Sequence, residues 1–155
     1  MTKFILSAAC FAAFLISFTG CSPAPDVSVN ESAGEKGSVL EVASQQDFAS
    51  MVEQSSIPVL VDFWATWCGP CISMNPVIKT TSARHQNRLR VVKVDVDQNK
   101  ELAGSMNIRA IPTLMLYHNG SAIAQFEGAM NEKQLDGWIA SQLERAGVSL
   151  AAPVM

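Results

Sequence analysis

The chain has 155 residues, 48% of them hydrophobic, and a formal net charge of −3. This length and composition fit one globular domain with flanking segments. The 11 Lys and Arg residues form no cluster, which argues against nucleic acid or an anionic membrane surface as a main partner.

The first 21 residues have the pattern of a targeting segment. The apolar run from Phe4 to Phe18 suits the hydrophobic region of a signal peptide and is too short to span a bilayer. It ends at Phe18-Thr19-Gly20-Cys21, which resembles a bacterial lipoprotein box, where cleavage before the cysteine leaves a lipid on its sulfur. We therefore predict residues 1–21 as signal peptide and lipobox, with lipidation at Cys21. The alternatives are ordinary secretion with cleavage near Gly20 and an uncleaved anchor.

In each of these versions the domain is exported. We expect a membrane-anchored lipoprotein of the bacterial cell envelope that faces the periplasm, or else a soluble periplasmic or secreted protein. Residues 22–37 are rich in Ser, Pro, Gly, Ala and Glu, which predicts a flexible tether, although an arm packed on the domain is the alternative. The domain itself is predicted at residues 38–147, followed by a C-terminal tail at 148–155.

Strand and helix patterns alternate through residues 38–147. Ser44 and Asn131 are expected to cap helices, Asn131 in a capping box with Gln134. Asn119-Gly120 predicts a two-residue hairpin turn. The predicted strands are residues 39–42, 59–64, 89–96, 113–118 and 121–127, and the predicted helices are residues 44–52, 68–86, 99–106 and a final one after Asn131. This order predicts an α/β domain with a central mixed sheet, mostly parallel with a C-terminal antiparallel hairpin, and helices on both faces.

Two cysteines, Cys68 and Cys71, follow a buried strand and begin a helix. At a helix start, free backbone N–H groups and the positive end of the dipole favour a thiolate, which is the nucleophile in disulfide exchange. A structural zinc site needs four ligands, but the remaining candidates, His85 and His118, each stand alone, so no metal is predicted. A Cys-x-x-Cys pair beside a βαβ pattern points instead to dithiol redox chemistry.

Between about residues 38 and 146, the chain resembles the thioredoxin family. The matching stretches are Val61-Asp62-Phe63-Trp64-Ala65, Trp67 to Cys71, Pro76, Lys93 to Asp97, Ile111-Pro112-Thr113, Asn119-Gly120 and Gly128-Ala129. The resemblance implies the thioredoxin fold, and a thiol–disulfide oxidoreductase whose working group is a Cys68–Cys71 disulfide with no other cofactor. It also implies that Cys68 is the exposed nucleophile and that Cys71 resolves the mixed disulfide.

Three further residues match catalytic positions of the family. Asp62 lies in an apolar strand, where burial should raise its pKa, and by resemblance it relays the proton of Cys71. Lys93 matches the position that pairs with it electrostatically. The alternative is a buried polar group that serves only fold specificity. Pro112 matches the family's cis-proline, whose loop offers the backbone of Ile111 to an extended substrate, and the alternative is a plain strand-initiating proline.

The resemblance places other residues around the substrate. Trp67 would shield Cys68 and line the substrate groove, and Gly69-Pro70 resembles the dipeptide of reducing thioredoxins. Gly128 would let the substrate backbone approach, and Ala129 and Met130 would extend an apolar rim that could equally be ordinary surface. Ile72 stands where the family usually has Lys or Arg, which makes this surface more apolar.

Together these features predict a monomeric, thioredoxin-like protein-disulfide reductase. Its substrates would be disulfide-containing exported proteins, and a membrane electron donor would re-reduce the Cys68–Cys71 disulfide, because the envelope is oxidising. An envelope oxidase or isomerase on the same scaffold is an alternative, since a change of ~30 mV in potential is only about 1.4 kcal/mol. A binding or assembly module with a dispensable redox site is another.

Overall fold

A computed structural model describes residues 38–150 of the chain. The predicted signal peptide, Cys21, the tether and residues 151–155 lie outside the described residues. Within this range five strands form one sheet in the order β1-β3-β2-β4-β5. The strands are β1 (Val39–Glu41), β2 (Val59–Trp64), β3 (Arg90–Asp95), β4 (Thr113–His118) and β5 (Ser121–Glu127).

The sheet is mixed, as predicted. β3 pairs in parallel with β1 and with β2, whereas β4 is antiparallel to both β2 and β5. The turn between β4 and β5 is the predicted hairpin turn, and both of its residues have positive φ, 50° at Asn119 and 75° at Gly120. Asparagine and glycine tolerate this left-handed backbone better than other residues, which explains why the chain reverses here.

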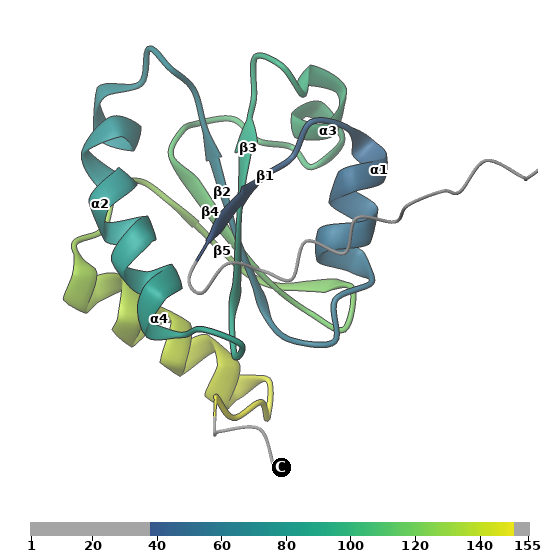
Figure 1. The fold of residues 1–155 in the computed structure, drawn as a ribbon. Coiled ribbons are helices and arrows are strands. Elements are labelled where there is room, and N and C mark those ends of the chain that lie inside the picture. The colour runs from purple at the N-terminus through teal and green to yellow at the C-terminus, as the bar shows by residue number, and fades with distance from the viewer. Residues whose placement is uncertain (1–37, 151–155) are drawn as a thin grey trace, which may run out of the picture. The chain divides into compact units, whose positions relative to one another are not determined.

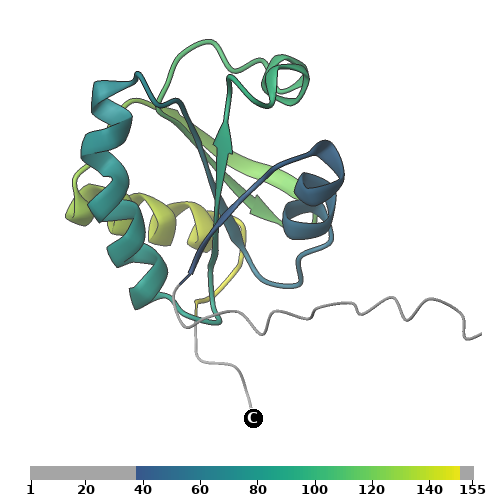
Figure 2. The ribbon, with the colours of Figure 1, turned by 45° about the horizontal axis from the view of Figure 1, so that its top comes forward.

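Helices cover both faces of the sheet (Figure 1 and Figure 2). They are α1 (Gln45–Phe48), which continues into the π-helical segment η1 (Ala49–Glu53), then α2 (Gly69–Arg84), α3 (Lys100–Ser105) and α4 (Glu132–Arg145). The predicted caps are confirmed: Ser44 Oγ accepts the N–H of Asp47, and Asn131 forms a capping box with Gln134. Among residues 38–150, no helix is long and apolar enough to cross a membrane.

Alternation of side chains along the strands divides the core into two layers. On β2, Val61 and Phe63 pack in the layer with Phe48 of α1, whereas Leu60 packs in the layer that contains residues of α2 and α4. Because successive strand residues point to opposite faces, Asp62 lies on the face of Leu60, beneath α2. The parallel register of β2 and β3 sets Asp62 opposite Lys93. The sheet thus carries a carboxyl group and an ammonium group to the underside of one helix.

Residues 148–150, predicted as the start of a tail, pack on the domain. The N–H of Val148 donates to the carbonyl oxygen of Leu143 at 2.8 Å, and Arg88 Nη1 donates to the carbonyl oxygen of Leu150 at 2.9 Å. Val148 and Leu150 also contact the core layer between the sheet and α4. This part of the C-terminal segment therefore extends the folded surface.

Candidate active site

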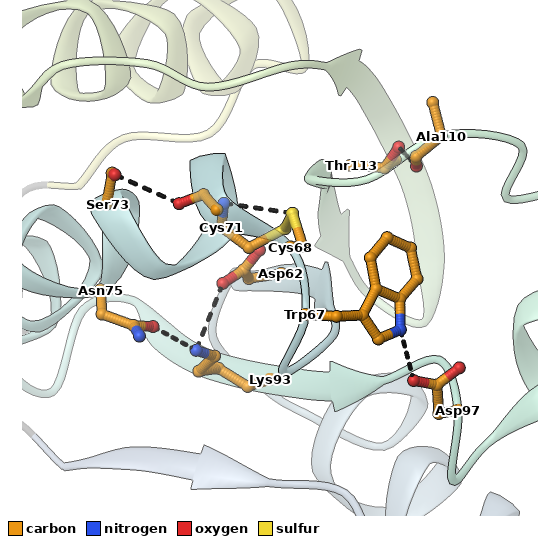
Figure 3. The surroundings of a disulfide bond; sticks show 11 residues. Asp62, Trp67, Cys68, Cys71, Ser73, Asn75, Lys93, Asp97, Ala110 and Thr113 are labelled. Carbon is orange, nitrogen blue, oxygen red and sulfur yellow. Dashed lines mark hydrogen bonds and ion pairs between the residues drawn. A yellow bond between two sulfur atoms is a disulfide. The ribbon is translucent and has the colours of Figure 1, made fainter.

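The two cysteines lie at the first turn of α2, where they form a disulfide (Figure 3). Cys68 is the N-cap residue, and its Sγ accepts a hydrogen bond from the backbone N–H of Cys71 at 3.2 Å. Pro70, in the first turn, has no N–H to leave unpaired and fixes φ near the helical value. The sulfur of Cys68 therefore lies where N–H groups and the helix dipole stabilise negative charge.

The two sulfurs differ in their access to solvent. Cys68 is 4% exposed and Cys71 is 0% exposed. The sequence predicted Cys68 as an exposed nucleophile, and it is the more accessible of the pair but only narrowly open. The pair is covered because it packs in a small cluster with Ala65, Trp64, Val96 and Ile111. A substrate sulfur can reach this disulfide only from the side of Cys68.

The loop before β4 lies against this cluster. Its Ile111–Pro112 peptide bond is cis, as the resemblance implied, and Ile111 contacts the cysteine cluster. Thr113 Oγ1 donates to the carbonyl oxygen of Ala110 at 2.7 Å, and the N–H of Gly128 donates to the carbonyl oxygen of Pro112 at 2.8 Å. Gly128 has a φ of 115°, which a residue with a side chain rarely adopts. These bonds hold Pro112 and Gly128 together at one edge of the site.

An open cleft runs beside the disulfide. It is lined by the exposed ring of Trp67 and by Val96, Ile108, Arg109 and Ile111. The indole Nε1 of Trp67 donates to Asp97 Oδ2 at 2.7 Å, so the ring has a fixed partner although it is 68% exposed. Trp67 and Ile111 were predicted to contact the substrate, whereas Arg109 in the lining of the cleft and Asp97 as the partner of Trp67 were not predicted.

Several other predicted substrate contacts lie on the surface. Gly69, Pro70 and Ala129 are exposed. The prediction that Met130 extends the apolar rim is wrong, because its side chain is buried and packs with α4. Ile72 is 50% exposed, and among the described residues it and Trp67 are the exposed large hydrophobics. The surface around the cysteines is therefore apolar on the helix as well as on the preceding loop.

Beneath the disulfide, a buried carboxyl group faces a buried ammonium group. Asp62 is 0% exposed, Lys93 is 7% exposed, and Lys93 Nζ lies 3.8 Å from Asp62 Oδ2. Neither oxygen of Asp62 has a hydrogen-bond partner. Burial raises the pKa of Asp62 from 3.8 to about 6, and the positive charge of Lys93 limits that rise. A carboxyl group with this pKa can take up and release a proton near neutral pH.

Asn75 is a polar neighbour of this pair that sequence analysis missed. Its Oδ1 accepts a hydrogen bond from Lys93 Nζ, and the same ammonium lies 3.9 Å from the centre of the Trp64 ring. One sequence signal could have revealed it. Asn75 lies four residues after Cys71 and so shares the buried face of α2.

Among residues 38–150, no group of three or more His, Cys, Asp and Glu residues is arranged to hold a metal ion. His85 lies 3.5 Å from Asp136 on α4, and burial together with Arg88 and Arg84 lowers the pKa of this imidazole. The reactive groups of the described site are the two sulfurs of its disulfide, the carboxyl group of Asp62 and the ammonium group of Lys93. A disulfide at a helix start, beside a cis-proline loop and above a buried carboxyl group, is the site of a dithiol redox protein.

Comparison with known proteins gives the same answer. The Thioredoxin family model matches residues 39–141. Thioredoxin of Haemophilus influenzae is 41% identical over 93 residues, which cover 60% of this chain and 87% of that one. The bifunctional thioredoxin reductase/thioredoxin of Mycobacterium leprae is 40% identical over 103 residues, which cover 66% of this chain and 22% of that one. The solved structure of a mutant thioredoxin from Halobacterium salinarum superposes with a TM-score of 0.63 and 33% identity, covering 70% of this chain and 94% of that one.

The chain belongs to the thioredoxin family. It is a thiol–disulfide oxidoreductase of the thioredoxin-like disulfide reductase class, and the predicted family and fold are confirmed.

Proposed function

We propose that this protein is an exported, membrane-anchored reductase that passes electrons from a membrane donor to disulfide-bonded proteins of the bacterial envelope. The observation that carries the proposal is the combination of an apolar leader ending at Cys21 with a thioredoxin-type site. An oxidising compartment allows disulfides to persist, so a reductase there has substrates and depends on an outside source of electrons. We expect it to act as a monomer.

The reaction begins at Cys68. Its thiolate, stabilised by the start of α2, attacks one sulfur of the substrate disulfide. The substrate S–S bond breaks, a mixed disulfide forms through Cys68, and the departing substrate thiolate takes a proton. The exposed ring of Trp67 and the backbone at Ile111 line the approach to this sulfur and orient an extended substrate segment.

In the second step, Cys71 and Asp62 resolve the mixed disulfide. The Asp62 carboxylate accepts the thiol proton of Cys71, and the resulting thiolate attacks Cys68 Sγ. The mixed disulfide breaks, the Cys68–Cys71 disulfide forms, and the second substrate thiol leaves with a proton. Two electrons have then passed to the substrate. A carboxyl pKa of about 6 suits this exchange near neutral pH.

The oxidised protein must then receive two electrons from another dithiol. The Mycobacterium leprae relative is named as both a thioredoxin reductase and a thioredoxin, which supports a dedicated electron donor for proteins of this kind. We propose that the donor here is a membrane protein, because the lipid on Cys21 would hold the domain at the membrane surface. Residues 22–37 would serve as the tether between lipid and domain.

The test is to trap the reaction intermediate in growing bacteria. The full-length chain with Cys71→Ser should accumulate mixed disulfides with envelope proteins through Cys68, and the variant with both Cys68→Ser and Cys71→Ser should accumulate none. The wild-type chain should be largely reduced when free thiols are trapped. A largely oxidised wild-type chain without a reducing partner would show an oxidase or isomerase instead. Full rescue of the deletion phenotype by the double variant would show a binding or assembly module.

The membrane anchor has its own test. The wild-type chain should incorporate labelled fatty acid, and Cys21→Ser should abolish this incorporation. Because Cys21→Ser also removes the cleavage site before residue 21, fatty-acid incorporation and not membrane fractionation of the variant is the measurement that decides. A wild-type chain in the membrane fraction without labelled fatty acid would overturn lipidation and leave the uncleaved leader as the anchor. A soluble wild-type chain would show ordinary secretion.

A further inference from the structure

We propose that Asn75 is a positioning residue that holds the Lys93 ammonium beyond hydrogen-bonding distance of Asp62. It thereby leaves the buried carboxyl group of Asp62 without a hydrogen-bonding partner. The catalytic consequence of this arrangement rests on the proposed function, whereas the arrangement itself can be tested in the oxidised protein alone.

The contacts around Lys93 Nζ carry the proposal (Figure 3). Asn75 Oδ1, from α2, accepts a hydrogen bond from this ammonium, and the Trp64 ring lies against it with its centre 3.9 Å away. Asp62 Oδ2 is 3.8 Å away, well beyond the ~3.2 Å limit of an N–H···O bond. The amide therefore takes the hydrogen bond that the carboxylate does not receive.

The charges around the ammonium determine where it would move without Asn75. Asp62 on β2 exerts the strongest electrostatic effect on Lys93, followed by Glu41 on β1, Lys79 on α2 and Asp95 on β3. The disulfide of Cys68 and Cys71 lies on the other side of Asp62 and carries no charge when oxidised. Because Asp62 attracts the ammonium most strongly, loss of the amide should let Lys93 close onto it.

A direct hydrogen bond from Lys93 would favour the charged form of Asp62 and lower its pKa. Bringing the two charges about 1 Å closer, at an effective dielectric constant of about 20, corresponds to a shift of about one pH unit. Asn75 therefore keeps the Asp62 carboxyl group protonatable near neutral pH, where Cys71 has to give up its proton. Removal of the amide would make Asp62 a weaker base.

The test is a carboxyl ¹³C NMR titration of the full chain labelled at aspartate, with the disulfide intact so that neither cysteine titrates. The Asp62 signal is assigned by its loss in Asp62→Asn. Asn75→Ala should move the Asp62 midpoint down by about one pH unit. Asn75→Leu keeps the side-chain size without an acceptor and should shift the Asp62 midpoint in the same direction. This second variant keeps the test valid if Asn75→Ala weakens the fold.

Two further variants serve as controls: one should shift the Asp62 midpoint in the opposite direction, and the other should not shift it. Asn75→Asp still binds the ammonium but adds a negative charge near Asp62. The titration midpoint of Asp62 should therefore rise in this variant. Ser73→Ala changes a neighbouring residue on α2 whose hydroxyl donates to the carbonyl oxygen of Gly69, and it should leave the Asp62 midpoint in place. An unchanged or raised midpoint in Asn75→Ala and Asn75→Leu would overturn the proposal.

The pH dependence of insulin reduction separates this inference from the proposed function. With dithiothreitol as reductant, the acidic limb of the rate profile should move to lower pH in Asn75→Ala, and the maximum rate should fall. A shifted NMR midpoint with an unchanged rate profile would keep Asn75 as the positioning residue and remove Asp62 as the base for Cys71. Failure to trap envelope partners would leave the titration result standing and count against the proposed function alone.

Discussion

The carboxyl group of Asp62 lies 3.8 Å from the ammonium of Lys93, and neither of its oxygens accepts a hydrogen bond. The native state therefore carries a desolvation cost for a charged Asp62 that this ion pair offsets only in part. Because burial raises the Asp62 pKa to about 6, the native state binds a proton between about pH 4 and 6 that the unfolded chain releases. The stabilisation from protonated Asp62 is complete below the unfolded pKa of about 4 and is lost as pH rises through about 6.

Replacing Asp62 with Asn should therefore stabilise the protein at pH 7 and have little effect at pH 4. We expect a gain of about 2 kcal/mol at pH 7, because the raised pKa corresponds to ~3 kcal/mol and Lys93 loses its charged partner. Urea unfolding at the two pH values measures this difference. Equal effects of Asp62→Asn at both pH values would contradict the burial of a charged group.

Gly120 in the hairpin turn should not tolerate a side chain. Its φ is 75°, and a Cβ atom there would lie 2.7 Å from the backbone carbonyl oxygen of Glu53. We expect Gly120→Ala to lower the free energy of unfolding by about 2 kcal/mol or more. Gly137, in the exposed middle of α4, has nothing within 4 Å of an added Cβ, so Gly137→Ala should stabilise by about 0.5–1 kcal/mol. Denaturant titrations of Gly120→Ala and Gly137→Ala measure both changes in the free energy of unfolding. Changes of the same sign in the two variants would contradict the prediction.

Much of this fold could be predicted because local pattern and tertiary structure agree. The apolar runs that became β2 and β3, the caps at Ser44 and Asn131 and the turn at Asn119 each depend on neighbouring residues alone. The π-helical form of η1 could not be predicted, because Ala49–Glu53 has an ordinary helical composition. In a π-helix each backbone N–H donates to the carbonyl oxygen five residues earlier, whereas in an α-helix it donates to the carbonyl oxygen four residues earlier.

In the candidate site, too, some residues could be predicted from local sequence and others could not. Cys68, Cys71 and Asp62 were found because a thiol pair at a helix start and a carboxylate in an apolar strand are unusual in any protein. The narrow exposure of Cys68 and the role of Asn75 were missed, because both depend on how α2 packs over the sheet. Asp97 was missed as a partner of Trp67 because the two residues are 30 positions apart and meet only in the folded chain.

The contact between Trp67 and Asp97 should tune substrate binding. Asp97 Oδ2 fixes the indole through a 2.7 Å hydrogen bond at an exposed place, where such a bond contributes about 1 kcal/mol. Asp97→Ala should therefore raise KM for insulin about fivefold with kcat nearly unchanged, because the ring is freed while the sulfurs stay in place. Asp97→Asn keeps an oxygen acceptor and should restore most of the affinity. A lower kcat with unchanged KM would show that Asp97 acts on the chemistry instead.

Ile72 is 50% exposed in the first turn of α2, directly after Cys71, and gives this surface an apolar side chain. A cation at this position would add to the positive potential around the cysteines, although solvent screens it. Ile72→Lys should therefore increase the rate of Cys68 alkylation by iodoacetamide in the reduced protein at pH 6 about twofold. Ile72→Gln removes the apolar surface without adding charge and should leave the rate at the wild-type value. If both variants accelerate alkylation equally, access to Cys68 and not electrostatics limits its reactivity, and the apolar surface of Ile72 then acts as a cover for the nucleophile.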